Sequence, residues 1–309
     1  MRTAFIQTLE GLAKKNSNIV LLNGDLGFSV LEHFTEQFPS RSMNMGVAEA
    51  NMMGAAAGLA LSGKTVFVYS IIPFVTARVY EQIRNDIALQ QANVKIIGVG
   101  AGLVYGQLGP THHAIDDLGL MRGLPNMTVF SPADPVEAEL VTKAAAAIKG
   151  PVYIRIGKKG DELIHTRKPS FRVGRALTLR SGSDITFCVT GSIAVHVLGA
   201  ARLLEEGGLS VRILSFPTIK PIDAKSILRA SRETKMIVTV EEHSVIGGLG
   251  SSVAEVLFDS SVMPTKTLRL GVRDRFTTRA GSHEDLRAFH QLQAEHIARH
   301  VLKKFKKQS

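Results

Sequence analysis

The sequence predicts an α/β protein of two domains, each with a mainly parallel sheet flanked by helices. Short β-rich runs alternate with longer stretches of helical periodicity along most of the chain. Several of these runs are apolar almost throughout, as expected for strands that are covered on both faces. The chain has 309 residues, of which 45% are hydrophobic. That length corresponds to about two domains of roughly 150 residues, each able to bury a core.

The expected strands fall into two series. The first comprises Ile19–Leu22, Thr65–Tyr69, Val94–Val99, Met127–Phe130 and Val152–Ile156. The second comprises Ile185–Val189, Leu209–Leu214, Met236–Val240 and Thr267–Leu270. Because helical segments lie between the strands, each series predicts a parallel sheet with helices on both sides.

Three helices have clear sequence signals. The segment Thr3–Lys15 places its apolar side chains on one face. A second helix begins at Asp134–Glu137, with an acidic cap, a proline at the first position and a glutamate at the third, and runs toward Gly150. The segment that begins at Ser282 predicts a single C-terminal helix.

The alternation weakens between residues 161 and 180, where the sequence is polar, basic and interrupted by Pro169 and Gly174. We therefore expect a first domain over residues 1–165, a linker over residues 166–180 and a second domain over residues 181–309.

Composition and charge restrict the classes of partner. The formal net charge of +10 favours anionic partners, although four lysines near the C-terminus are explained as a solvated helix end. Aromatic residues make up 6% of the chain, tryptophan is absent, and basic and aromatic residues are not interleaved, so nucleic acid is not expected as a partner. The single cysteine, Cys188, excludes an intramolecular disulfide and a thiolate-rich metal site.

The sequence also contains no uninterrupted apolar run of about 18 residues, so no membrane span is expected. The N-terminal segment lacks the apolar stretch of a signal peptide. We therefore expect a cytoplasmic protein that does not bind membranes.

Two segments combine glycines or small residues with a carboxylate. Asn23–Gly27 directly follows an expected strand and contains Asp25, although taken alone the segment favours an ordinary strand-to-helix turn. Met45–Ala60 places Glu49 at the start of a helix of small and apolar residues. A buried carboxylate there is costly unless it is paired or neutral; alternatively, the helix dipole alone favours an acid in the first turn.

Two further segments follow later strands. Gly98–His113 is a glycine-rich loop that ends in His112 and His113, which predicts either proton transfer or an ordinary surface pair. Adjacent histidines without a cysteine make a zinc site an inferior explanation. Glu241–Gly250 contains part of a dinucleotide fingerprint, but Val253 stands where the third glycine belongs, so this motif is weak evidence.

Taken in order, these motifs resemble the transketolase family over almost the whole chain. They read NGDLG, GVAEANMMGAAAGLA, GPTHHAIDDLGLMRGLPNMTVFSPADPVEAE, GPVYIRIG and TVEEHSVIGGLG. The resemblance is closer to the C-terminal half of transketolases that are encoded as two subunits. Deoxyxylulose-phosphate synthases share the pattern.

The resemblance implies a pyrimidine-binding domain of a thiamine-diphosphate enzyme over residues 1 to about 160 and a transketolase C-terminal domain from about residue 176. In the family, a third domain binds the diphosphate and its metal and carries a Gly-Asp-Gly signature, which this sequence lacks. The resemblance therefore implies an N-terminal partner subunit that holds most of the Mg²⁺ (or Ca²⁺) site. It also implies a heterotetramer that is active only with that partner.

For the cofactor, the resemblance assigns four residues of this chain. Glu49 matches the glutamate that hydrogen-bonds the aminopyrimidine ring and favours its imino tautomer, so that the ring can take a proton from the thiazolium carbon. Phe74 is the candidate for the aromatic residue against the pyrimidine, with Ile72 nearby; plain core packing is the alternative for Phe74. Asp25 matches an acidic position near the cofactor. The chain itself is expected to supply no metal ligand.

For the substrate, the resemblance implies that His112 handles protons on a substrate hydroxyl. It further implies substrate contacts by Lys158, Arg155 and Gln107. Leu108 replaces an aspartate that recognises a substrate hydroxyl in standard transketolases.

Two other departures concern phosphate-contacting residues. Gly100 stands in place of a histidine, and Lys158 stands in place of an arginine. Lysine keeps the charge but loses the bidentate geometry of arginine. The sugar substrate is therefore expected to be non-standard.

The resemblance thus implies a transferase of carbohydrate metabolism that moves a two-carbon ketol unit between sugars or sugar phosphates. One alternative is another thiamine-dependent assembly, either a deoxyxylulose-phosphate synthase-like enzyme or the beta subunit of a 2-oxoacid dehydrogenase. Another is a non-catalytic protein that retains the fold. Glu49 argues against a non-catalytic protein, because a site that has lost its activity has no need for a carboxylate in an apolar helix.

Overall fold

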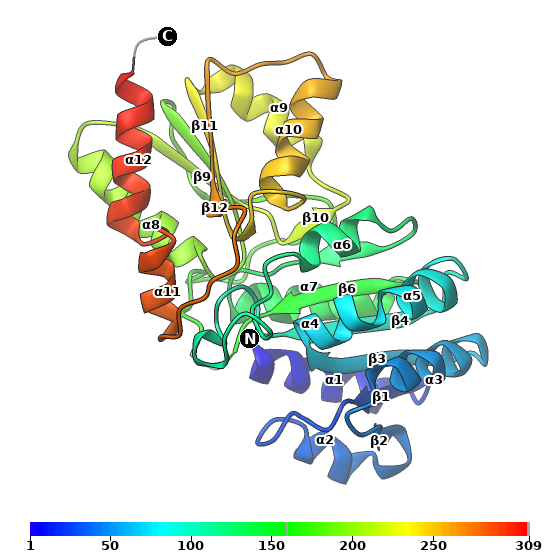
Figure 1. The fold of residues 1–309 in the computed structure, drawn as a ribbon. Helices are drawn as coiled ribbons and strands as arrows, with labels where there is room; N and C mark the ends of the chain where they lie inside the picture. Colours follow the sequence, from blue (N-terminus) through cyan, green and yellow to red (C-terminus); the bar gives the residue numbers. More distant parts are fainter. Residues whose placement is uncertain (159, 308–309) are drawn as a thin grey trace.

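The first domain is built on a seven-stranded sheet (Figure 1). The computed structural model describes residues 1–158 and 160–307. The strand order is β10-β5-β6-β4-β3-β1-β2, and every neighbouring pair is parallel except β10 with β5. The strands are β1 (Ile19–Asn23), β2 (Ser42–Asn44), β3 (Thr65–Ile71), β4 (Val94–Val99), β5 (Thr128–Phe130), β6 (Val152–Ile156) and β10 (Thr218–Lys220).

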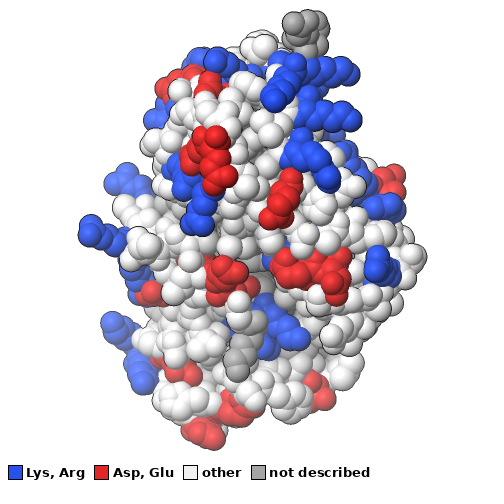
Figure 2. Space-filling model, turned by 90° about the vertical axis from the view of Figure 1, so that its left-hand side faces the viewer, with Lys and Arg blue, Asp and Glu red and all other residues white. Residues whose placement is uncertain are grey.

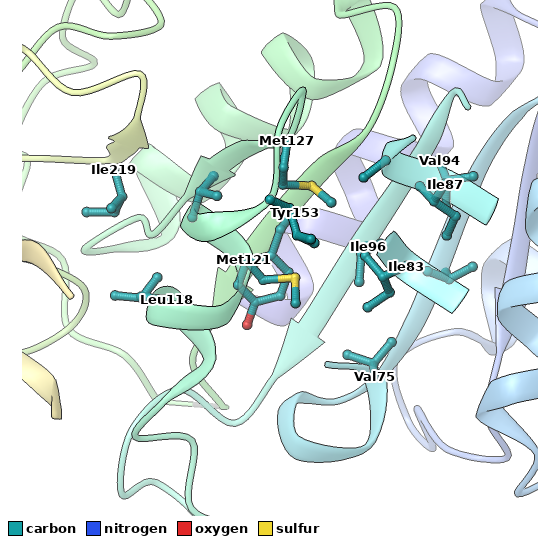
Figure 3. Packing of buried hydrophobic residues seen from close by; sticks show 14 of the residues in the cluster. Val75, Ile83, Ile87, Val94, Ile96, Leu118, Met121, Met127, Tyr153 and Ile219 are labelled. Carbon is teal, nitrogen blue, oxygen red and sulfur yellow. The ribbon is translucent and has the colours of Figure 1, made fainter. Parts of the chain in front are cut away.

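Helices cover both faces of this sheet. They are α1 (Arg2–Lys15), α2 (Glu32–Gln37), α3 (Glu49–Leu61), α4 (Ile72–Val75), α5 (Tyr80–Gln82), α6 (Asp117–Gly123) and α7 (Pro135–Ala147). Short turns of other helix types are η1 (Pro39–Arg41), η2 (Ala77–Val79), η3 (Ile83–Ala88) and η4 (Gly106–Leu108). Along β3, Val66 and Val68 pack with α3, while Phe67 and Tyr69 pack with α1 on the other face. Figure 3 shows part of the α3-side cluster, between the sheet and the helices over it.

The second domain has a five-stranded sheet in the order β12-β11-β8-β9-β7, in which only β7 with β9 is antiparallel. Its strands are β7 (Leu177–Arg180), β8 (Ile185–Thr190), β9 (Val211–Ser215), β11 (Met236–Ser244) and β12 (Lys266–Val272). Its helices are α8 (Ala194–Glu206), α9 (Ala224–Glu233), α10 (Leu249–Asp259), α11 (His283–Phe289) and α12 (Ala294–Lys306). The α8 and α12 helices pack on one face and α9 and α10 on the other (Figure 1). The predicted two-domain α/β fold is confirmed.

The two domains share one core rather than being joined by a tether. Leu118 and Met121 of α6 belong to the same buried cluster as Leu249 and Val253 of α10. The three-residue strand β10 comes from the second half of the chain but pairs with β5 of the first sheet. Three residues give no readable periodicity, so the sequence did not predict this exchange.

The expected linker differs from the observed connection. Leu177–Arg180 forms β7 and belongs to the second sheet, so the irregular connection ends before residue 177. The connection is also held in place, because the Asp134 carboxylate accepts hydrogen bonds from the backbone of Ile164 and His165, each at 3.1 Å. The exact domain limits stay a prediction.

The prediction of a single C-terminal helix is wrong. The segment divides into α11 and α12, and Gln291 between them has a φ of 57°. Leu286 and Leu292 are both fully buried. In one continuous helix, residues six apart point about 120° away from each other, so the break lets both side chains reach the core.

None of the described helices is long and apolar enough to cross a membrane. Three of the C-terminal lysines, Lys303, Lys304 and Lys306, lie in the last turn of α12, where cations favour the negative end of the helix dipole. Figure 2 shows positively charged side chains gathered near this end of the molecule.

The helix cap that the sequence predicted can be tested. The Asp134 side chain is fully buried and accepts hydrogen bonds from the backbone of Glu137 at 2.8 Å, Ile164 and His165. Asp134→Ala leaves these donors without their acceptor and should lower the free energy of unfolding by about 2 kcal/mol or more. Urea denaturation measures this loss. Asp259→Ala, at an exposed aspartate, should change stability by no more than about 0.5 kcal/mol; an equal loss for both variants would contradict the role of the cap.

Candidate active site

Most of the predicted site residues gather at one edge of the first sheet. The neighbouring parallel strands β6, β4, β3 and β1 all end there. They are followed by Lys158, the loop Gly98–His113, the short helix α4 and Asp25. In open α/β sheets, this carboxyl edge is where ligands bind.

Glu49 is the first residue of α3, and its side chain is only 2% exposed. Its Oε1 accepts a hydrogen bond from Ser70 Oγ at 3.3 Å, and its Oε2 accepts one from Arg78 Nη1 at 2.8 Å. Ser70 lies near the end of β3, while the Arg78 side chain is 47% exposed. The carboxylate is thus buried from one side and paired toward solvent on the other. The helix dipole and this pairing offset the cost of burying it.

Phe74 connects Glu49 to the histidine loop. Its ring centroid lies 5.1 Å from that of His112, with the two rings at 74° to each other. The Arg78 guanidinium carbon lies 4.1 Å from the Phe74 ring centroid. Arg78 therefore contacts both Glu49 and Phe74, and the structure brings together the predicted carboxylate, aromatic ring and histidine.

His112 belongs to a loop whose glycines adopt conformations that other residues rarely tolerate. Gly100, Gly102 and Gly109 have φ values of 93°, 64° and 77°. His112 is half-buried, and its Nδ1 lies 3.0 Å from Thr111 Oγ1. The neighbouring His113 is buried instead, and burial lowers its pKa. The two histidines therefore differ in environment, and His112 is the one open to a ligand.

The other residues predicted to contact the cofactor or the substrate differ in how deeply they are buried. Ile72 is fully buried beneath the glycine loop, packed with Ala101 and Ala114. Asp25 is exposed and accepts a hydrogen bond from Asn44 Nδ2 at 2.8 Å. Gln107 is exposed in η4. Lys158 is exposed, with its Nζ 5.2 Å from the Tyr105 ring centroid. These assignments stay predictions.

Arg155 lies apart from the other predicted substrate contacts. Its side chain is 2% exposed, and its Nε donates to Asp117 Oδ2 at 2.9 Å. Its Nη2 donates to the backbone oxygens of Ala114 at 2.8 Å and Glu242 at 2.9 Å. The guanidinium is thus engaged by the interior. This environment supports a structural role, and the predicted substrate contact has no support in the geometry.

Sequence reasoning missed the importance of Glu242. This residue of β11 accepts hydrogen bonds from the Leu103 backbone at 2.7 Å, His283 Nε2 at 2.6 Å and Arg287 Nε at 2.6 Å. Burial opposes its charge, but the adjacent Arg287 and His283 hold the pKa of the Glu242 carboxyl well below its usual range. A carboxylate from the second domain therefore fixes the glycine loop of the first. The only signal of this role in the sequence was the pair of adjacent acids, Glu241 and Glu242, after the expected strand Met236–Val240.

The partial glycine motif after β11 does not form a nucleotide site. The Glu241 carboxylate accepts hydrogen bonds from the backbone of Leu249 at 2.6 Å and Gly250 at 2.7 Å. These are the N–H groups that a phosphate would need at the start of α10. Burial raises the pKa of Glu241 to about 7. The weak dinucleotide motif is thus explained by an internal contact.

Among the described residues, no group of three or more His, Cys, Asp or Glu side chains is arranged to hold a metal ion. The candidate site consists of one buried carboxylate, one aromatic ring, one half-buried histidine and exposed cations. Such a site can bind an organic cofactor and exchange protons with it and with a substrate.

Two family models match this chain. The transketolase pyrimidine-binding domain matches residues 1–160, and the transketolase C-terminal domain matches residues 174–297. The chain therefore belongs to the transketolase family, which confirms the predicted resemblance. Glu49, Phe74 and His112 all lie within the first of these domains.

Several relatives of similar length are named as transketolase subunits or as a split-gene transketolase. An apulose-4-phosphate transketolase subunit of Phocaeicola vulgatus is 37% identical over 99% of this chain and 97% of its own length. A 6-deoxy-6-sulfo-D-fructose transketolase subunit of Clostridium sp. strain MSTE9 is 38% identical over 89% of this chain and 85% of its own. A solved split-gene transketolase, described as an inactive beta4 tetramer, is 40% identical with a TM-score of 0.89, over 98% of this chain and 97% of that one.

A synthase relative is longer than this chain. The 1-deoxy-D-xylulose-5-phosphate synthase 1 of Geobacter sulfurreducens is 34% identical over 92% of this chain, but the match spans only 45% of that protein. The chain is thus similar in full length to split transketolase subunits and to only part of the synthase.

The structural role of Arg155 can be separated from a substrate role. Arg155→Ala leaves the Asp117 carboxylate buried without its ion-pair partner, which should cost about 3–5 kcal/mol of unfolding free energy. Lys158→Ala, at an exposed position just beyond the end of the same strand, should cost less than about 0.5 kcal/mol. Chemical denaturation of both variants measures the difference. Wild-type stability for Arg155→Ala would restore this residue as a proposed substrate contact.

Proposed function

We propose that this chain is the C-terminal subunit of a thiamine-diphosphate-dependent, split transketolase-type enzyme. In this proposal, it transfers a two-carbon ketol unit between sugars or sugar phosphates in complex with its partner. The observation that carries the proposal is the buried Glu49 beside Phe74 and His112 at the carboxyl edge of the first sheet. The relatives of similar length, which are transketolase subunits, support it.

The residues present fit the pyrimidine half of the cofactor. A buried carboxylate suits a hydrogen bond to a ring nitrogen, and the Phe74 ring offers an apolar face next to it. Arg78 touches both groups in this structure, so it would shift its contacts when a ring binds between them. Ile72 supports the site from below, and Asp25 would lie near the cofactor from the end of β1.

These positions suggest which chemical steps the cofactor supplies and which the side chains of this chain supply. Thiamine diphosphate supplies, when bound, the carbon nucleophile and electron sink that ketol transfer requires. Glu49 would hydrogen-bond the pyrimidine ring and exchange a proton with it there. His112, which lies in the glycine loop, would exchange a proton with a substrate hydroxyl.

The substrate is proposed to be a non-standard sugar. Lys158 and Gln107 are exposed beside the glycine loop and are the proposed contacts to its polar groups. Leu108, 53% exposed, presents an apolar side chain where the family carries an aspartate. Relatives named for apulose 4-phosphate and for a sulfonated fructose support substrates outside the common pentose phosphates.

A partner subunit is proposed to supply the diphosphate site and the Mg²⁺ (or Ca²⁺) ion. Two large apolar side chains, Phe28 and Val47, are 78% and 73% exposed close to Asp25 and Glu49 in sequence. Exposed apolar residues next to a binding site indicate a surface that another protein covers. A heterotetramer of two copies of each subunit, acting in the cytoplasm, completes the proposal. Nucleic acid and membranes are not proposed as partners.

The first experiment measures binding of thiamine diphosphate with Mg²⁺ to the purified chain, alone and with the partner subunit. Calorimetry should detect tight binding only in the presence of the partner, because this chain supplies only the pyrimidine side. Tight binding to the chain alone would contradict the half-site. In the same assembly, release of carbon dioxide from pyruvate instead of ketol transfer would favour the synthase or 2-oxoacid dehydrogenase alternative.

The activating role of Glu49 has a separate test. Glu49→Gln keeps the size of the side chain but cannot share a proton in the same way. In the complete assembly, turnover should fall by roughly 100-fold or more, the scale of general acid–base catalysis, while the chain stays folded. Steady-state kinetics and circular dichroism measure both. A merely twofold to threefold loss of turnover would rule out Glu49 as the activating acid.

A further inference from the structure

A small cavity lies at the carboxyl end of β12, outside the candidate active site. Its volume is about 170 Å³, and it lies between that strand end and the turn that joins α11 to α12. Its polar lining comes from Arg273, Arg275, His290, Gln291 and His300. No residue of the candidate active site lines it. Because β11 and β12 are parallel, this end of the sheet is a favoured place for a ligand.

Among the described residues that line the cavity, the ionisable groups are all arginines and histidines. Arg273 and Arg275 form no ion pair with any residue in the described ranges 1–158 and 160–307. Asp274, which separates them, is exposed and does not line the cavity. Arg273 and Arg275 are both exposed, so solvent screens their mutual repulsion, but two guanidinium groups without an ion-pair partner at one cavity still attract an anion.

His290 adds a buried imidazole ring to this lining. It is 8% exposed, and its Nε2 lies 2.7 Å from the hydroxyl of the fully buried Thr277. When that hydroxyl donates, the ring proton resides on Nδ1. Within the described part of the chain, Nδ1 has no hydrogen-bond partner. In that tautomer the buried N–H lacks an acceptor, which is unfavourable, and an anion oxygen that reached it would satisfy it.

The neighbouring groups support a positive potential in the cavity. Burial lowers the pKa of His300, and the charges of Arg299, His296, Arg273 and Lys303 lower it further. The pKa of His290 is lowered by burial and then by Arg275, with a raising contribution from Glu242 and a lowering one from His113.

Two contacts hold the cavity walls in place. The Arg275 guanidinium carbon lies 4.7 Å from the Phe289 ring centroid, which fixes a flexible side chain at the rim. His300 Nε2 lies 2.6 Å from Gln291 Oε1, so these two side chains fix each other. Groups held before a ligand arrives lose less conformational entropy on binding it.

We propose that this cavity binds the phosphate group of a small phosphorylated metabolite. Arginine guanidinium groups match the oxygens of a phosphate bidentately. The cavity is smaller than the roughly 300–1,000 Å³ of pockets that enclose whole drug-sized ligands, so only the phosphate end of a ligand fits inside it. This site goes beyond the proposed ketol transfer and does not depend on it.

The site also lies one packing layer from the glycine loop. Val272, between the lining residues Gly271 and Arg273, packs against Leu103 of that loop and Leu286 of α11. A phosphate bound by Arg273 would therefore lie next to Val272, which packs against the loop that carries His112.

The test uses the full chain without its partner and inorganic phosphate as the probe. Phosphate should bind saturably in calorimetry and raise the thermal unfolding midpoint. Arg273→Ala and Arg275→Ala should each weaken binding by roughly tenfold or more. Arg229→Ala is the matched control, because Arg229 is exposed on α9 and does not line the cavity. This control should bind phosphate as the wild type does.

Several results would overturn the proposal. Absence of saturable binding would do so, as would equal weakening by Arg229→Ala, which would indicate only a response to net charge. If phosphate does not bind but Arg273→Ala weakens assembly with the partner subunit, the cavity accepts an acidic side chain of that subunit instead. Arg273→Gln, checked for folding by circular dichroism, replaces the alanine variant if the latter is unstable.

Discussion

One buried arginine holds the architecture of the site together. Arg155 extends from β6 and donates to Asp117 of α6, to the backbone of Ala114 directly after the glycine loop and to the backbone of Glu242 in the second domain. A guanidinium is suited to this task because its donors fan out in a plane and stay charged when buried. The sheet, the loop and the second domain are therefore tied to one rigid group. Removing it would leave buried acceptors and a carboxylate uncompensated on three elements at once.

The second domain acts on the candidate site through this connection. Glu242 accepts from the Leu103 backbone, and Gly102 must be a glycine because any side chain there would collide with the Glu242 carboxylate. Arg287 and His283 in turn compensate the charge of Glu242. The loop that presents His112 is thus supported from behind by a domain that contributes none of the candidate site residues. This arrangement gives the C-terminal domain a physical role in the site, namely to fix the loop at low entropic cost when a ligand binds.

The sequence predicts those features whose causes are local. Val94–Val99 is apolar at almost every position because both faces of β4 are covered, so its limits could be read directly. Glu49 stood out locally as a carboxylate in a helix of alanines and glycines, and the family resemblance supplied its expected role. By contrast, β10 is three residues long, and its pairing with β5 depends on the packing of the two domains. The functions of Arg155 and Glu242 depend likewise on partners about 40 to 140 residues away in sequence, which no local pattern encodes.

The exposure of the candidate site fits the proposed second subunit. Glu49 is buried on the protein side, yet its partner Arg78 is nearly half exposed, and Phe74 and His112 are only half-buried. The proposed carbon-nucleophile chemistry requires that water be excluded, since solvent weakens electrostatic contacts and hydrolyses or protonates reactive groups. This chain alone leaves the candidate site open on the side of Arg78. Phe28 and Val47, exposed close by in sequence, offer the apolar surface that a covering subunit would bury. The incomplete enclosure and these two exposed apolar residues fit the proposal that this chain forms one wall of the site and the partner subunit forms the other.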